Sequence, residues 1–110
     1  MDSNMFQGRA HETSHDTMIG GDMLLYPVLG LAGESGELLN KIKKIYRDSG
    51  GVYTHEDRNA VIDELGDILW YVSEVATQLG IELSIVAERN LLKLASRKQR
   101  GVISGSGDNR

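Results

Sequence analysis

The chain has 110 residues, of which 40% are hydrophobic and 25% are charged, with a net charge of -4 and no cysteine. A chain of this length forms one domain whose core is small for its surface, so self-association would help to stabilise it. The lack of cysteine excludes disulfides and thiolate metal sites, and the negative charge argues against general binding to a nucleic-acid backbone.

The first residues, Met1-Asp-Ser-Asn, are polar and lack the basic and apolar regions of a signal peptide. No apolar run approaches the roughly 20 residues that a membrane-spanning helix needs. A chain without cysteine is typical of a reducing compartment, where proteins rarely form disulfides. The sequence therefore predicts a cytoplasmic protein that binds neither membrane nor nucleic acid.

A short helix is predicted over about residues 4–14, before a break at the glycine pair 20–21. His11-Glu12-Thr-Ser-His15 spells the HExxH pattern, in which two histidines one turn apart bind zinc. Such a zinc site needs a third ligand and a helix beneath a substrate cleft, whereas the flanks here are polar and His55 is the only other histidine. We therefore interpret these residues as surface histidines.

A second helix is predicted over about residues 23–46, with Pro27 tolerated near its start. Its apolar positions recur at helical spacing, with Ser35 as the one polar member, through Leu24, Val28, Leu31, Leu38, Ile42 and Ile45. Each of the glycines at 30, 33 and 36 costs a helix about 1 kcal/mol relative to alanine. They predict a close approach to the backbone, by a neighbouring helix or by a ligand.

Turn residues at 48–51 end that helix, and Thr54 with Asp57 resembles a capping box at the start of a third helix over about residues 55–79. Its apolar stripe comprises Val61, Leu65, Ile68, Val72, Val75 and Leu79. A second stripe runs beside it through Glu64, Asp67, Tyr71, Glu74 and Gln78. Trp70 lies off both stripes and is interpreted as a core or subunit contact, with stacking on a base as the alternative.

Each of these two long helices carries a pair of carboxylates three residues apart, Glu34 with Glu37 and Glu64 with Asp67. Residues at this spacing project from one helix face, so each pair can present its oxygens to a common point. If the apolar stripes pack together, all four acids line the rim of the contact. Lys41, one turn after Glu37, is interpreted as its ion pair or as a phosphate ligand.

A fourth helix is predicted over about residues 83–99, with Asn90, Lys93 and Arg97 on its polar side. These three side chains form either an anion site or a solvated basic face. The remaining residues, 101–110, are rich in glycine and serine and are predicted to be non-helical. We expect this tail to be mobile when alone, or to fold over a site or a neighbouring subunit.

Four carboxylates without histidine or cysteine favour Mg²⁺ over zinc, because Mg²⁺ prefers oxygen ligands and often binds substrate phosphates as well. Bound there, it would neutralise polyphosphate charge and activate a water, with a free carboxylate as base. No glycine-rich loop followed by Lys-Ser/Thr is present, which excludes a P-loop NTPase. On the pattern alone, ordinary acidic pairs on surface helices remain the alternative.

At these residues the sequence resembles the MazG-like family of all-α nucleoside triphosphate pyrophosphohydrolases, whose signature is Glu-x-x-Glu, a spacer, and Glu-x-x-Asp. The segments GLAGESGEL and DELGDILWY are close to the family's usual wording, and ERNLLKLASR resembles its fourth-helix pattern. Phe6-Gln7, Ala10 and Thr13 also resemble its N-terminal pattern. The similarity covers about residues 6–101, whereas the ending RGVISGSGDNR departs from the Tyr-Pro ending of many members and resembles short single-domain versions, including those of phages.

The resemblance implies an all-α bundle of about four helices over residues 1–100, completed by dimerisation or tetramerisation and followed by the tail at 101–110. It implies cleavage of an NTP or dNTP between its α and β phosphates, with Mg²⁺, for which Mn²⁺ can substitute. Four residues would hold the metal, one of them polarising the water: Glu34, Glu37, Glu64 and Asp67. The substrate would be bound by Lys41, Asn90, Lys93 and Arg97.

Two alternatives stay open on the sequence. One is the same chemistry on another substrate, such as phosphoribosyl-ATP or a guanosine alarmone. The other is a helical oligomeric module that binds Mg²⁺-nucleotide for regulation without turning it over.

Overall fold

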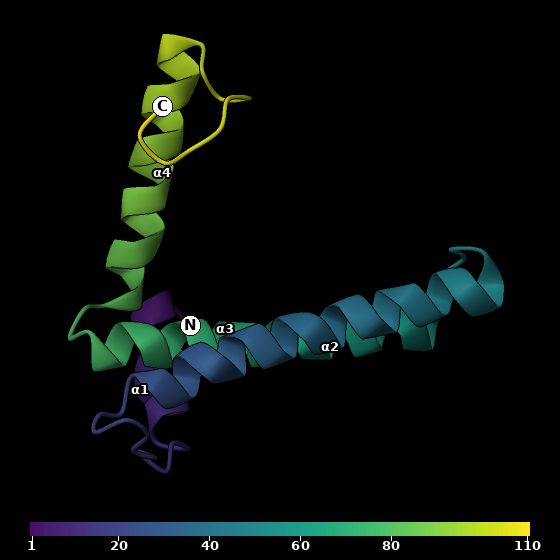
Figure 1. Ribbon diagram of the computed structural model, residues 1–110, viewed down its shortest axis with the longest axis horizontal. Coiled ribbons are helices and arrows are strands. Elements are labelled where there is room, and N and C mark those ends of the chain that lie inside the picture. The colour runs from purple at the N-terminus through teal and green to yellow at the C-terminus, as the bar shows by residue number, and fades with distance from the viewer.

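The computed structural model describes residues 1–110 and contains four helices: α1 (Ser3–His11), α2 (Leu25–Ser49), α3 (His55–Gln78) and α4 (Leu83–Arg100). Helices α2 and α3 run side by side as an antiparallel hairpin, α1 crosses one end of it, and α4 projects away from that same end (Figure 1). The all-α class and the four predicted helices are confirmed. None of the helices combines the length and the apolar character that crossing a membrane requires.

Local sequence signals explain where the helices begin and end. The predicted capping box opens α3, because Asp57 N donates to Thr54 Oγ1 and Thr54 N donates to Asp57 Oδ2, both over 3.0 Å. Helix α2 ends at Gly50, whose φ of 62° suits glycine. Helix α1 ends at His11, earlier than predicted, since Thr13 N and Ser14 N bond back three residues in tight turns.

The two long helices meet along a different line from the one that periodicity predicted. Glu64 and Glu74, from the polar stripe of α3, are 7% and 2% exposed, whereas Leu65 and Leu79, from its apolar stripe, are 51% and 57% exposed. A pair of helices can bury only the faces that they turn to each other, and α3 turns its Glu64–Gln78 stripe toward α2. We call this contact line the α2–α3 seam.

Only one of the predicted glycine contacts occurs. A Cβ on Gly30 would lie 2.1 Å from Cε1 of Tyr71, so the tyrosine ring rests directly on the α2 backbone. A Cβ on Gly33 or Gly36 would meet nothing within 4 Å. These two glycines are exposed and face open space.

Large apolar side chains remain at the surface on three helices. The buried hydrophobic residues are few: Ala10, Ile45, Ala76 and Leu83. Leu39 of α2, Ile62 of α3, and Leu91 and Leu92 of α4 are between 58% and 70% exposed. A single chain therefore leaves much apolar surface uncovered, as expected for a domain with a small core.

Helix α1 ties the hairpin to α4. Gln7 Nε2 donates to the backbone oxygen of Ile81 over 2.8 Å, and Gln7 Oε1 accepts from Leu83 N over 2.8 Å. His11 Nδ1 lies 3.2 Å from both carboxylate oxygens of the buried Glu74. These bonds satisfy backbone groups in the α3–α4 turn and fix the end of the hairpin from which α4 projects.

Candidate metal-binding site

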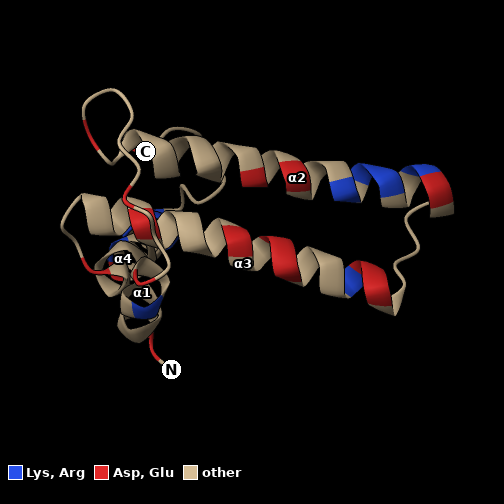
Figure 2. Cartoon of the chain, turned by 90° about the horizontal axis from the view of Figure 1, so that it is seen from below, with Lys and Arg blue, Asp and Glu red and all other residues tan.

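Three of the four predicted carboxylates converge in the α2–α3 seam. Glu34, Glu64 and Asp67 each offer one oxygen, and the three oxygens lie within 4.8 Å of one another. Helix α2 supplies the first and α3 the other two, and Figure 2 shows the acidic bands of the two helices opposite each other. The structure does not bring Glu37 into this group, and its side chain is exposed.

Burial differs among the three acids and suits a cation ligand set. Glu64 is buried, Glu34 is half-buried and Asp67 is exposed, so the group opens from the seam to solvent. One oxygen of Glu64, Oε2, is buried and has no hydrogen-bond partner. An unpaired buried carboxylate oxygen is costly unless a cation or a donor reaches it. Oxygen ligands alone are what Mg²⁺ and Mn²⁺ prefer.

Lys41 pairs with Glu64 across the seam, and no ion pair joins it to Glu37, its expected partner along the helix. Its Nζ lies 2.9 Å from Glu64 Oε1. Lys41 is half-buried, and its side chain reaches across to α3. One lysine therefore compensates one of three converging carboxylates, which leaves a local excess of negative charge.

The pKa values of the cluster reflect this excess. Desolvation is the main cause that raises the pKa of Glu34, followed by the adjacent carboxylate of Glu64 and by the charges of the other neighbouring acids. The hydrogen bond from Lys41 is the main cause that lowers the pKa of Glu64, and it raises the pKa of Lys41 in turn. A bound cation would favour the ionised form of Glu34 and remove the repulsion.

A cavity of about 280 Å³ opens next to the carboxylates and is lined by Glu34, Asp67, Trp70 and Tyr71. The two aromatic rings meet edge to face, with centroids 4.9 Å apart. Trp70 is half-buried, and its Nε1 donates to Thr13 Oγ1 over 2.9 Å, so one end of the indole is held by the segment after α1. The sequence placed Tyr71 in the same stripe as Glu64 and Asp67 but did not predict it as a site residue, although its position four residues after Asp67 is a usable signal.

The three predicted substrate ligands on α4 lie apart from the carboxylates. Asn90 and Lys93 are exposed, and Arg97 is buried beneath the tail. Helix α4 makes no contact with α2, and it meets α3 only near the turn that joins them. Within one chain, therefore, the structure brings Lys41 to the carboxylate cluster but leaves Asn90, Lys93 and Arg97 on the projecting helix.

The HExxH residues do not share one helix face. His11 is the last residue of α1 and pairs with Glu74, whereas His15 lies in the following loop. His11 therefore serves as a structural link between α1 and α3, which accounts for it without zinc. The group of residues that can hold a metal contains carboxylates alone.

Comparison with known proteins identifies the family. The sequence model of the family described as the MazG nucleotide pyrophosphohydrolase domain matches residues 22–102. The gene 37 protein of Mycobacterium phage L5 is 59% identical over 87 residues, which cover 79% of this chain and 76% of that protein. No solved structure matches the chain. The helices, the carboxylate cluster and these similarities agree, and the chain belongs to the MazG nucleotide pyrophosphohydrolase family.

Proposed function

We propose that the protein hydrolyses a nucleoside or deoxynucleoside triphosphate to the monophosphate and pyrophosphate, with Mg²⁺ as cofactor and Mn²⁺ as a substitute. The observation that carries the proposal is the convergence of Glu34, Glu64 and Asp67 beside a cavity of about 280 Å³. Membership of the family supports the reaction class. The reaction adds one water across the anhydride between the α and β phosphates.

The cation would be held by Glu34, Glu64 and Asp67, with Glu37 one turn away on α2. Once bound, it supplies charge neutralisation of the polyphosphate and a lowered pKa for a coordinated water. The orphaned Oε2 of Glu64 and the absence of nitrogen or sulfur ligands in the cluster fit a hard divalent cation.

The protein's own residues perform the remaining tasks. A carboxylate oxygen that the cation does not engage would accept the proton of the attacking water as general base. Trp70 and Tyr71 wall the cavity beside Asp67. Lys41 holds Glu64 in place across the seam, and it is close enough to the cluster to contact a phosphate oxygen.

We also propose that the protein works as a homodimer or homotetramer. Asn90, Lys93 and Arg97 would bind the substrate phosphates, yet α4 keeps them away from the carboxylates of the same chain. A second copy packed on the exposed apolar residues of α3 and α4 would bury Ile62, Leu91 and Leu92. It would also bring the basic residues of α4 in one copy to the carboxylates of the seam in the other. Burial of such surface is the usual driving force for association.

The test is to incubate the purified protein with each NTP and dNTP in Mg²⁺ and to measure pyrophosphate and orthophosphate separately. Pyrophosphate with the matching monophosphate is the expected product, and phosphoribosyl-ATP and a guanosine alarmone extend the substrate panel. Glu88→Gln serves as a charge-matched control, because Glu88 is exposed on α4, away from the cluster. Release of orthophosphate alone, or nucleotide binding without turnover, would contradict the proposal.

A further inference from the structure

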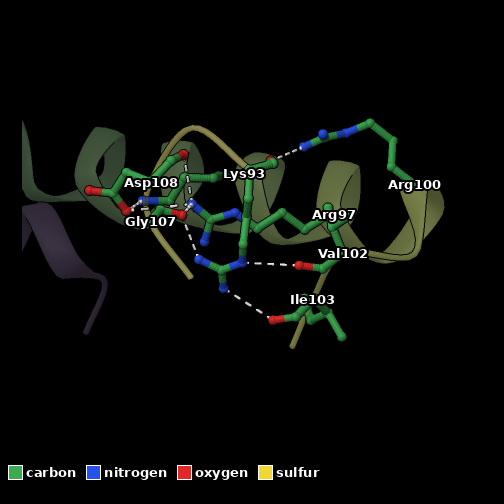
Figure 3. A network of polar contacts seen from close by, with 8 residues as sticks. Lys93, Arg97, Arg100, Val102, Ile103, Gly107 and Asp108 are labelled. Carbon is green, nitrogen blue, oxygen red and sulfur yellow. Dashed lines mark hydrogen bonds and ion pairs between the residues drawn. The ribbon is translucent and has the colours of Figure 1, made fainter. Parts of the chain in front are cut away.

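The segment that follows α4 folds back along that helix and covers two of its cations. Lys93 and Arg97 lie one turn apart on α4, and Asp108 reaches both of them (Figure 3). Its Oδ1 lies 3.2 Å from Lys93 Nζ and 3.4 Å from Arg97 Nη2. The backbone oxygen of Asp108 accepts a further bond from Arg97 Nη2 over 2.8 Å. A carboxylate thus occupies the basic face that the proposed function gives to phosphates.

Arg97 is held incompletely by these contacts. Arg97 is 5% exposed, and its Nε is buried without a partner. All of its hydrogen bonds come from Nη2, which is shared between Gly107 and Asp108. A guanidinium carries five donors in a planar fork that suits two-point binding of a phosphate. A phosphate can therefore satisfy a group that the tail leaves unpaired.

Arg110 keeps the segment in its folded-back shape. Its guanidinium donates to the backbone oxygens of Val102 over 3.0 Å, Ile103 over 3.1 Å and Gly107 over 2.6 Å. These bonds close a loop that places Asp108 over the two cations. The Asp108 side chain is itself 85% exposed, so a competing anion has access to the contact.

We propose that residues 102–110 form a strap that occupies the Lys93–Arg97 anion site in the free protein and that the polyphosphate of the substrate must displace. The biological role of this strap rests on the proposed function, because that function makes the two cations phosphate ligands. The displacement itself is a property of anion binding and can be measured without turnover. The apparent affinity for a polyphosphate is reduced by the fraction of molecules in which the strap is closed.

The experiment is a calorimetric titration of the full chain with inorganic triphosphate, without divalent cation. We expect Asp108→Asn to bind triphosphate about three- to tenfold more tightly, because the competing carboxylate is gone. Glu88→Gln changes the net charge equally at an exposed α4 position. We expect its affinity to stay within about twofold of the wild type, because Glu88 lies on another face of α4 from Lys93 and Arg97 and exposed charges are screened.

A second variant distinguishes the strap from general electrostatics, because the two predict opposite changes in triphosphate affinity. Arg110→Gln removes a positive charge, so long-range electrostatics alone predicts weaker triphosphate binding. Because Arg110 keeps the strap closed, our proposal predicts tighter binding. Tighter binding in both Asp108→Asn and Arg110→Gln supports the strap. Unchanged or weaker binding in either variant, or no detectable binding in any variant, overturns it.

Nucleotide hydrolysis by the same preparations separates this inference from the proposed function. If both variants bind triphosphate more tightly but no nucleotide is cleaved, the strap stands and the proposed function fails. If nucleotides are cleaved and the triphosphate affinity of both variants equals that of the wild type, the function stands and the strap is wrong.

Discussion

The α2–α3 seam and the α4 arm carry opposite charges and are organised in opposite ways. In the seam, two long helices hold Glu34, Glu64 and Asp67 close together with Lys41 as a built-in counter-ion. On the arm, Lys93 and Arg97 touch no other helix and are held by the chain's own tail. Under the proposed function the seam would bind a cation, whereas the arm would bind an anion whose place the carboxylate of Asp108 takes.

We expect the largest effect on hydrolysis from Glu64→Gln in the seam. The substitution keeps the shape of the side chain but removes the buried charge, so we expect hydrolysis to fall by a factor of about 10² or more. The far-ultraviolet circular dichroism should be unchanged, because Lys41 retains an oxygen acceptor. If Glu64→Gln hydrolyses nucleotide as well as Glu88→Gln does, or if it unfolds, the proposed role of the Glu64 carboxylate is wrong.

Gly30→Ala tests how tightly the seam is packed. Its new Cβ would lie 2.1 Å from Cε1 of Tyr71, so the ring must move and we expect a loss of about 1–3 kcal/mol of unfolding free energy by overpacking. Gly33→Ala is the matched control, because its Cβ meets nothing within 4 Å and alanine favours a helix by up to about 1 kcal/mol. Urea denaturation of both variants measures the difference.

If Gly30→Ala proved as stable as Gly33→Ala, the close seat of Tyr71 on α2 would be wrong. The fluorescence of Trp70, the only tryptophan, offers a second signal because its ring lies 4.9 Å from that of Tyr71. We expect its emission to change in Gly30→Ala and to stay unchanged in Gly33→Ala.

Thr54→Ala probes the turn that sets the two helices of the seam against each other. It removes the oxygen that accepts from Asp57 N, and we expect a cost of about 1 kcal/mol of unfolding free energy. Thr54→Ser keeps the acceptor and should retain most of the stability. Thermal unfolding distinguishes the two variants, and equal melting temperatures would show that the capping box does not stabilise α3.

The smallest expected effect is on the pH dependence of the metal-free protein. The folded-state pKa of Glu34 is raised above its usual value of 4.5, so folding favours its protonated form. The contribution of Glu34 to the free energy of unfolding therefore falls as the pH rises from 4.5 through the raised pKa. Glu34→Gln should therefore raise the melting temperature at pH 7 in the absence of metal, with no gain below about pH 4. A gain that is independent of pH would point to packing instead of charge.

Much of the fold follows from periodicity and local signals. The four helices and the capping box at Thr54 were predictable, because each depends on residues close together in sequence. Helix α2 continues three residues past its predicted end at about residue 46, up to the turn at Gly50. The stripe that faces the seam was not predictable. On α3 an apolar and a polar stripe lie side by side, and the rotation of α3 against α2 decides between them.

The candidate site was also predictable only where it depends on residues close together in sequence. The i, i+3 spacing predicted two pairs, Glu34 with Glu37 and Glu64 with Asp67, and the structure brings all but Glu37 together. The pairing of Lys41 with Glu64 and the seat of Tyr71 on Gly30 cross the seam, so they require the rotation that the sequence does not specify. The contact of Asp108 with Arg97 depends on how the tail turns back, and glycine and serine in that tail allow many paths.

The most direct test of the account is a crystal structure of the protein grown with Mn²⁺, with data collected at the manganese absorption edge. We predict an anomalous difference peak in the α2–α3 seam, within bonding distance of oxygens from Glu34, Glu64 and Asp67. A seam without such a peak at saturating Mn²⁺, or a peak confined to other residues, would contradict the central claim that these carboxylates form the metal site.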